Sequence, residues 1–224
     1  MNRRTQLIAA LLWILVVLYP NPLMLVATVW RTLSPTIDAE SARALAATLP
    51  DDPDVIRDKV LNELAMYEYN WYTYNVPWYF PSAKEVIRDR RGDCEGQAIL
   101  LASILQAKGI PYQLKMSFDH MWVDYAKKKP TEMENDDMAF ARRDGNNVKI
   151  NLPKHFDLAN YINIQLDARW HPMPAYRKAL LCAGIALIAF GPSLFQQSRR
   201  LPPVPAAYTW VGNRAWRRSG QHQG

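Results

Sequence analysis

Length, composition and charge describe a folded protein with basic ends. The chain has 224 residues, of which 49% are hydrophobic and 21% charged, which allows one domain with appendages and excludes a disordered or collagen-like chain. Two cysteines in this length exclude a disulfide scaffold. Residues 36–170 hold all 21 acidic residues and 17 basic ones, a charge of −4, so the overall charge of +6 comes from the flanks. We therefore expect no nucleic acid as a partner.

The N-terminal segment, residues 1–31, is predicted to be a transmembrane segment. Between Arg4 and Arg31 lie 26 uncharged residues, enough for a helix that crosses about 30 Å of hydrocarbon. Two prolines at positions 20 and 22 should kink or end the helix, so that residues 23–30 lie in the membrane interface. A cleaved signal peptide also begins with basic residues and an apolar run, but no clean small-x-small site follows closely here.

A second transmembrane helix is predicted at residues 179–198, an uncharged run bracketed by pairs of basic residues. Two spans place both termini on one side, and the arginines near both ends indicate that this side is the cytoplasm. We therefore expect a protein of the plasma (inner) membrane whose middle domain is extracytoplasmic. Residues 199–224, rich in proline and arginine, are predicted to be a disordered cytoplasmic tail near anionic headgroups.

The domain at residues 36–170 is predicted to begin with helices. Acidic residues and Pro53 precede apolar residues at helical spacing from Val55 to Ala65. Residues 67–80 then contain eight aromatic side chains, which form either a packing cluster, the interpretation we favour, or a substrate-lining surface. A short helix should follow at residues 81–90 and a turn at residues 91–93. Cys94 then opens a Leu-rich helix that ends before Gly109.

Strands are expected after these helices. Residues 112–118, 120–126, 138–142 and 148–152 have the composition and alternation of strands, with turn residues between the last two. Helices followed by an antiparallel sheet give an α+β fold.

Cys94 and His120 are the candidate catalytic pair. Asp93 is a natural N-cap, which places Cys94 in the first turn of its helix. The positive end of the helix dipole there favours a thiolate, and the free backbone N–H groups can stabilise an oxyanion. A nucleophilic cysteine needs a base within hydrogen-bond reach, and His120 begins the second predicted strand. For a lone cysteine and histidine, burial in the core is the commoner explanation.

Four elements around this pair resemble the transglutaminase-like superfamily. They are Gly-Asp-Cys at residues 92–94, an apolar helix, Gly-Ile-Pro at residues 109–111 and His-Met-Trp-Val at residues 120–123. The resemblance covers about residues 55–152, and it is specific because the four elements occur in the family's order. It implies a papain-like α+β core in which Cys94 is the nucleophile, His120 is the general base and Trp122 packs beside them.

The resemblance also implies a third catalytic residue, Asp or Asn, on the strand after the histidine strand, and here the sequence departs from the family pattern. Folding the chain back after the histidine strand places Asp136 or Asp137 level with His120. Aligning on the end of the following strand selects Asn151 instead. We predict Asp137 as the third member and keep the other two as alternatives.

The expected function is that of a membrane-anchored cysteine enzyme of the bacterial envelope. The resemblance implies attack by Cys94 on an amide or peptide bond through a thioester, in a peptidase or amidase more than a crosslinking enzyme. Expected partners are a protein or peptide substrate and membrane lipids. We expect no cofactor and no metal, since no metal-ligand spacing is present. The alternative is a catalytically inactive scaffold or binding module in a membrane complex.

Overall fold

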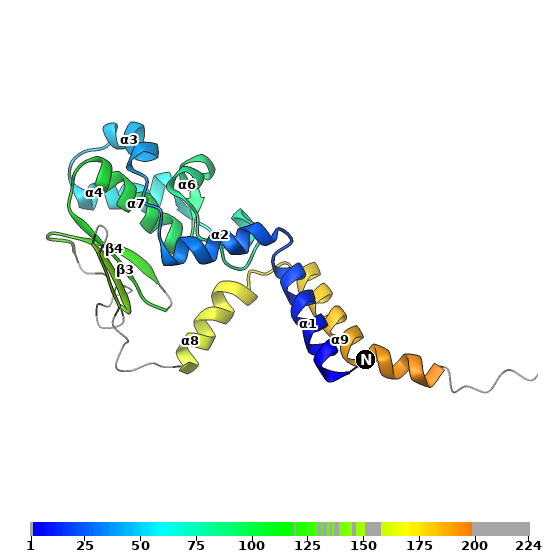
Figure 1. Ribbon diagram of the computed structural model, residues 1–224. Helices are drawn as coiled ribbons and strands as arrows, with labels where there is room; N and C mark the ends of the chain where they lie inside the picture. Colours follow the sequence, from blue (N-terminus) through cyan, green and yellow to red (C-terminus); the bar gives the residue numbers. More distant parts are fainter. Residues whose placement is uncertain are drawn as a thin grey trace, which may run out of the picture.

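The chain has a mixed α+β fold, drawn in Figure 1 from a computed structural model. The structure describes residues 2–118, 120–129, 131, 134, 136, 139–144, 147–150 and 158–198. Its elements in chain order, with η for a π-helical turn, are α1 (Arg3–Leu18), α2 (Pro22–Leu33), α3 (Ala39–Ala47), α4 (Pro53–Lys59), η1 (Val60–Leu64), β1 (Met66–Tyr67), α5 (Asn70–Thr73), α6 (Ala83–Asp89), β2 (Arg91–Gly92), α7 (Cys94–Ala107), β3 (Tyr112–Met116), β4 (Met121–Tyr125), β5 (Ala141–Asp144), β6 (Asn147–Ile150), α8 (Leu158–Gln165), η3 (Leu166–Trp170) and α9 (Ala175–Ser198). The predicted α+β class is confirmed.

Helix α7 is the centre of the core. Ten of its fourteen residues are buried, so the helix is apolar on nearly all sides. Asp93 caps it as predicted, since its side chain accepts a hydrogen bond from the Gly96 N–H at 3.1 Å. Helices α3, α4 and α6 and strands β3 and β4 pack around α7, and Figure 1 shows the helices on one side of it and the strands on the other. This packing fixes the direction in which the first turn of α7 points.

The sheet has four antiparallel strands in the order β4-β3-β5-β6. Strand β4 therefore lies at one edge, next to α7, with Met121 and Val123 buried in the core. The predicted strands at residues 112–118 and 120–126 correspond to β3 and β4. The later strands begin and end at other residues than predicted, at Ala141–Asp144 and Asn147–Ile150.

The segment between α4 and α7 differs from the sequence prediction. The helix that starts at Pro53 ends at Lys59 and continues only as the π-helical turn η1. Residues 91–93, predicted as a turn, instead begin with β2, which pairs with β1 in parallel. The Met66 N–H donates to the Arg90 carbonyl at 3.1 Å, and the Glu68 N–H to Gly92 at 3.1 Å. Local sequence propensity did not predict these strands, because their pairing joins segments about 25 residues apart in the sequence.

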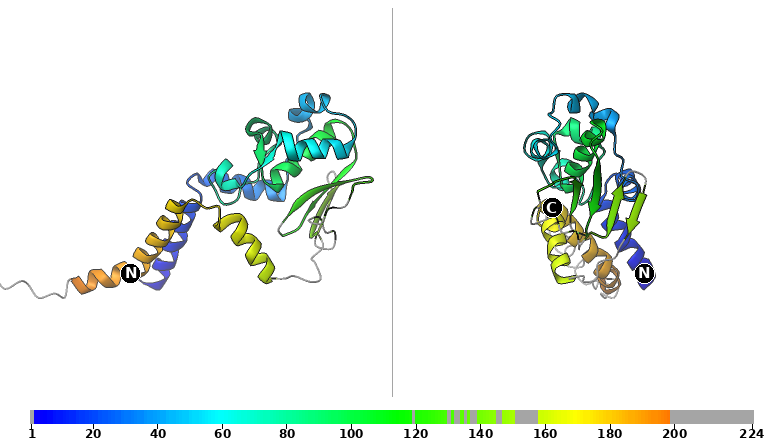
Figure 2. Two further views of the ribbon diagram at one scale, coloured as in Figure 1. Left: turned by 180° about the vertical axis from the view of Figure 1, so that it is seen from behind. Right: turned by 90° about the vertical axis from the view of Figure 1, so that its left-hand side faces the viewer.

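Helices α1 and α9, which come from opposite ends of the chain, pack side by side and extend from one end of the domain, as both views in Figure 2 show. We call this pair of helices the hairpin. Trp13 Nε1 donates to the Leu180 carbonyl at 3.1 Å, and its ring covers Gly184, where a Cβ atom would lie 2.0 Å from Nε1. Gly184, which has no side chain, thus lets the two helices approach closely.

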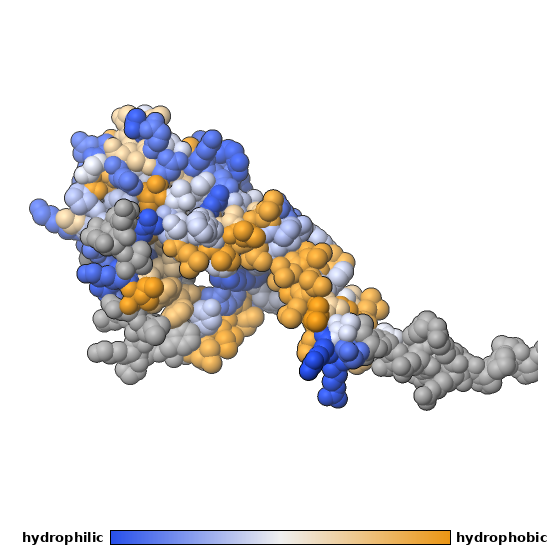
Figure 3. Space-filling model, in the orientation of Figure 1, coloured by the Kyte–Doolittle hydropathy of each residue, from blue (hydrophilic) through white to orange (hydrophobic). Residues whose placement is uncertain are grey.

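Most of the hairpin's outer side chains are exposed and apolar, and Figure 3 shows this apolar surface continuing onto the neighbouring face of α2.

Within the described residues, no helix by itself combines the length and apolarity needed to cross a membrane. Two pairs of consecutive helices meet that requirement together, each across a sharp bend: α1 with α2, bent by 85°, and residues Tyr161–Trp170 with Ala175–Gly191, bent by 110°. The bend after α1 lies at Pro20 and Pro22, where the sequence predicts it. The two predicted transmembrane helices stay a prediction, and the predicted tail at residues 199–224 lies outside the described residues.

A half-buried ion pair connects α2 to the rest of the domain. Arg31 lies 2.7 Å from the Glu85 carboxylate and also donates to the Phe80 carbonyl at 3.0 Å. Glu85 completes a capping box with Ser82 and accepts from the Tyr79 hydroxyl at 2.6 Å. Burial by itself would raise the pKa of Glu85, but these hydrogen bonds and the Arg31 charge outweigh it and hold the pKa below its usual value.

We expect Glu85→Gln to lower the free energy of unfolding by about 1–3 kcal/mol near pH 7, because hydrogen bonds to a charged acceptor are lost. A lowered pKa in the folded state means that the carboxylate stabilises the fold above its unfolded pKa, about 4.3, and that this stabilisation is lost as the pH falls through the folded value. Unfolding monitored by circular dichroism at pH 7 and pH 3 should show the difference shrinking at low pH. Glu40→Gln is the control, because Glu40 forms only an exposed pair with Arg43; an equal loss in both variants would contradict the prediction.

Candidate active site

Cys94 is the first residue of α7, half-buried beneath neighbouring elements. The Asp93 cap satisfies the Gly96 N–H, whereas the N–H groups of the first two helical residues lack partners within the helix. The thiol points toward its neighbour, since Cys94 Sγ donates to Glu95 Oε2 at 3.2 Å. A nucleophile at this position has backbone donors beside it for a developing negative charge.

The fold brings His120 to the same place. His120 precedes β4 and is held by Ser117, whose Oγ accepts from the His120 N–H at 3.0 Å. The next residue, Met121, hydrogen-bonds Cys94 through its backbone. Strand β4 is an edge strand of the sheet and packs against α7. Cys94, His120 and Met121 therefore line the same two cavities.

Trp122 stacks on His120, with ring centroids 5.8 Å apart and the ring planes at 11°. The indole is buried while the imidazole is half-exposed. The stack restricts the rotation of the imidazole, as a general base requires if it is to keep one orientation.

Two cavities meet at Cys94 and His120. One, of about 320 Å³, extends toward α2 and Trp78, and the other, of about 550 Å³, extends toward α4 and Lys128. Both are lined by Cys94, His120, Met121, Tyr67, Tyr69, Ile164 and Ala168. We call the two together the Cys94 cleft. A chain-like substrate could lie across the pair with one side of the reacting bond in each cavity.

The aromatic segment at residues 67–80 contributes both to packing clusters and to the wall of a cavity. Trp71 and Phe80 are buried in packing clusters. Tyr67, Tyr69 and Trp78 line the first cavity. Burial raises the pKa of Tyr67 above its usual value, so this hydroxyl stays neutral.

The ionisation of Cys94 is opposite to the sequence prediction. Burial, followed by the charges of Glu95 and Asp93, raises the pKa of the Cys94 thiol well above its usual value. The hydrogen bond from Met121 acts in the other direction but does not compensate. Burial of the thiol, together with the two carboxyl groups adjacent in sequence, acts against the helix dipole that was expected to favour a thiolate. The raised pKa favours the neutral thiol over the thiolate near pH 7.

Asp93 is itself an unusual carboxyl group. Burial, and next the neighbouring Glu95, raises the pKa of Asp93 well above its usual value. Its Oδ2 accepts from Asn70 Nδ2 at 2.5 Å, a contact between the short helix α5 and the start of α7. Asn70 thus positions the turn that carries Cys94, a role that nothing in its sequence context signals.

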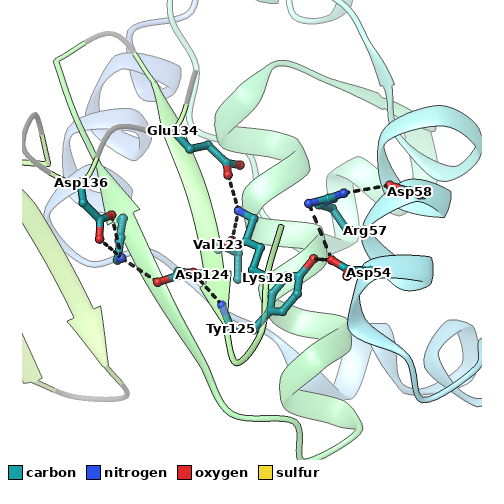
Figure 4. A network of polar contacts seen from close by, with 10 residues as sticks. Asp54, Arg57, Asp58, Val123, Asp124, Tyr125, Lys128, Glu134 and Asp136 are labelled. Atoms are coloured by element: carbon teal, nitrogen blue, oxygen red, sulfur yellow. Dashed lines mark hydrogen bonds and ion pairs between the residues drawn. The ribbon is translucent and has the colours of Figure 1, made fainter. Parts of the chain in front are cut away.

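Asp136, an alternative for the third catalytic residue, is bound elsewhere. The buried Lys115 amino group lies 2.8 Å from Asp136 and 2.6 Å from Asp124, so both carboxylates neutralise this lysine (Figure 4). Asp137 and Asn151, the predicted third member and the other alternative, lie outside the described residues. In the part of the chain that is described, no three His, Cys, Asp or Glu side chains are grouped so as to hold a metal ion.

The far wall of the second cavity carries a buried lysine. Lys128 Nζ lies 2.6 Å from both Glu134 and the Val123 carbonyl, as Figure 4 shows. Burial lowers the pKa of Lys128, and Glu134 opposes that shift. The lysine follows a residue in the left-handed conformation, Lys127 (φ 63°), which turns the chain back after β4. This wall is polar, whereas the first cavity is lined by several aromatic side chains, among them Tyr67, Tyr69 and Trp78.

Helix α8 and η3 close the cleft on the side that sequence analysis left unassigned. Tyr161, Ile164 and Ala168 line it, and the Arg169 guanidinium lies over the Trp78 ring at 5.3 Å. The Trp71 indole N–H donates to the Arg169 carbonyl. The available signal was an apolar repeat just before the second predicted span. Glu95 was also missed, although it directly follows Cys94.

We expect Glu95→Gln to increase the alkylation rate of Cys94 at pH 7, because it removes a negative charge that raises the thiol pKa. A fall of one pKa unit gives about ten times more thiolate, so an increase up to about tenfold is expected. In the unchanged protein the rate should be low at pH 7 and rise through the alkaline range. The measurement is iodoacetamide labelling in a Cys182→Ala background, with the exposed Glu63→Gln as control. Equal rates in Glu95→Gln and the control would contradict the assignment.

Comparison with known proteins gives no relative for this chain: no protein-family model, curated protein or solved structure matches it.

Proposed function

We propose that this chain is a membrane-anchored cysteine enzyme with a papain-like, transglutaminase-like core, and that it cleaves an amide or peptide bond. The observation that carries the proposal is the placement of Cys94, at the N-terminus of α7, and His120, at the start of β4, in one cleft. Both residues line the same two cavities, which supports the proposal that the imidazole can reach the thiol when a substrate is bound. The resemblance in sequence order points to the same chemistry.

The reaction starts from a neutral thiol. As Cys94 Sγ attacks the carbonyl carbon, His120 takes the thiol proton, and the new oxyanion accepts a hydrogen bond from the Cys94 N–H. Collapse of this intermediate breaks the C–N bond, and His120 gives its proton to the leaving amine. A thioester on Cys94 remains. His120 then deprotonates a water, whose attack releases the acid and restores the thiol.

Hydrolysis is the better proposal than crosslinking, because the chemistry above needs only water as the second substrate. Asp137 is our proposed partner for His120, since Asp136 is neutralised by Lys115. We place the domain outside the inner membrane, where proteins or peptides of the bacterial envelope are the available substrates. The apolar hairpin of α1 and α9 supports the anchoring.

A second candidate function is a non-catalytic module with this fold, serving as a scaffold in a membrane complex. Two observations favour it: the raised pKa of Cys94 and the hydrogen bond of its thiol to Glu95. A structural cysteine is expected to be neutral and partly buried in this way.

The test is a search for products with the full-length protein in lipid vesicles. The protein is incubated with a mixture of envelope peptides, and mass spectrometry records new amino termini, released ammonia and an acyl adduct on Cys94. The enzyme predicts products that disappear in Cys94→Ala and persist in Cys182→Ala. Binding of peptides without Cys94-dependent products would favour the scaffold.

A further inference from the structure

Helix α8 and its continuation η3 have two different faces. The outer face carries a line of exposed apolar side chains four residues apart: Leu158, Ile162, Leu166 and Trp170, which are 39–59% exposed. The inner face, with Tyr161 and Ala168, lines the Cys94 cleft. A helix that faces water would carry polar side chains on its outer face. Among the described residues, no other segment covers these apolar side chains.

Helix α2 repeats the arrangement on the other side of the cleft. Leu23, Val26, Trp30 and Leu33 follow one face at helical spacing and are 65–77% exposed. Thr32 of the same helix lines the first cavity, which is also lined by α8. The first cavity is therefore lined by two helices that both expose apolar residues.

Both helices turn sharply away from the hairpin. The bend is 85° between α1 and α2 and 110° between η3 and α9. If the hairpin follows the membrane normal, both helices lie within about 20° of the membrane plane. Figure 1 shows α2 and α8 leaving the same end of the hairpin, and Figure 3 shows apolar surface on both and on the hairpin.

We infer that α2 and α8–η3 lie flat in the membrane interface, with their outer faces in lipid, so that the Cys94 cleft opens at the membrane surface. The inference rests on the membrane anchoring proposed above. Its occupant is a lipid bilayer, because the two faces continue the apolar surface of the hairpin. Trp30 and Trp170 have the side chain preferred at the lipid headgroups, and Lys178 lies over the Trp170 ring at 5.5 Å. The polar Asp167 is bonded to His171 at 2.8 Å, a pair that headgroups can accommodate.

This placement defines a substrate class. A substrate that enters between α2 and α8 comes from the interface, so the amide bond belongs to an amphiphile held in the membrane by its apolar part. Its polar part then reaches the second cavity, whose wall carries Lys128 and Glu134.

The experiment measures depth in the bilayer at single positions of the full chain. A nitroxide label is attached to Ile162→Cys or Val26→Cys in a Cys94→Ala, Cys182→Ala background, in vesicles of phosphatidylcholine and phosphatidylglycerol. Val55→Cys is the matched control, because Val55 is an exposed aliphatic residue of α4, which Figure 1 shows at the end of the domain far from the hairpin. Collisions with lipid-soluble oxygen are compared with collisions with a water-soluble nickel chelate.

We expect oxygen to exceed the nickel chelate at positions 162 and 26, with the ratio reversed at position 55. A water-like ratio at position 162 overturns the inference. Retention of the chain on vesicles after an alkaline carbonate wash is measured in the same samples. Retention with a water-like ratio means that the anchoring stands and only the interfacial placement fails, whereas loss of retention removes both.

Discussion

Replacing Cys94 with alanine is expected to lower kcat for amide hydrolysis by on the order of 10⁴-fold or more, because no other group on the described surface of the cleft can form the thioester. His120→Ala should cause a loss of similar size, since the two residues act as a unit and their effects are not additive. The measurement is the rate of product formation under saturating substrate, once the substrate search has supplied one.

Matched variants make this result specific. Cys182→Ala removes the other cysteine, which is exposed on α9, and should leave kcat unchanged. Asp136→Asn should change kcat little, because Asp136 pairs with Lys115, whereas Asp137→Asn should lower it if Asp137 orients His120. Hydrolysis that persists in Cys94→Ala would end the cysteine mechanism.

Replacing Leu100 with alanine is expected to lower the free energy of unfolding by about 2–5 kcal/mol, the largest stability effect that we predict. Leu100 lies at the middle of α7 and is fully buried among helices and strands, so the lost methyl groups leave a cavity that the packed neighbours cannot close. Denaturant unfolding followed by circular dichroism measures the change.

Two controls bracket this prediction. Ile99→Val deletes a single buried methylene and should cost about 0.5–1.5 kcal/mol. Val55→Ala changes a side chain that is 40% exposed on α4 and should cost less than either core variant. A loss in Leu100→Ala no larger than in Val55→Ala would show that α7 is not the centre of the core.

The two proposals depend on different parts of the molecule. The cysteine chemistry needs only α7, β4 and the cleft, and it would survive if α2 and α8 proved to face water. The interfacial placement needs the sharp bends at both ends of the hairpin and the two exposed apolar faces. The vesicle measurements test the placement in a protein without the catalytic thiol, so each proposal can fail by itself.

The sequence by itself determined the local features of this protein. The Asp93 cap, the apolar face of α7, the two strands after it and the bend at the paired prolines all follow from signals within a few residues, and each is present in the structure. The order of helices before strands also sufficed for the α+β class. Such signals are readable because capping, turn formation and helical or strand periodicity are short-range effects.

Only the tertiary structure decided how these parts act on one another. It paired β1 with β2, assigned Asp136 to Lys115, placed α8 over the cleft and desolvated the half-buried Cys94, so that its pKa is raised where the helix dipole predicted the opposite. Each outcome depends on burial or on charges from segments distant in sequence. Desolvation and Coulomb interactions are set by three-dimensional distance, and a linear sequence does not contain that distance.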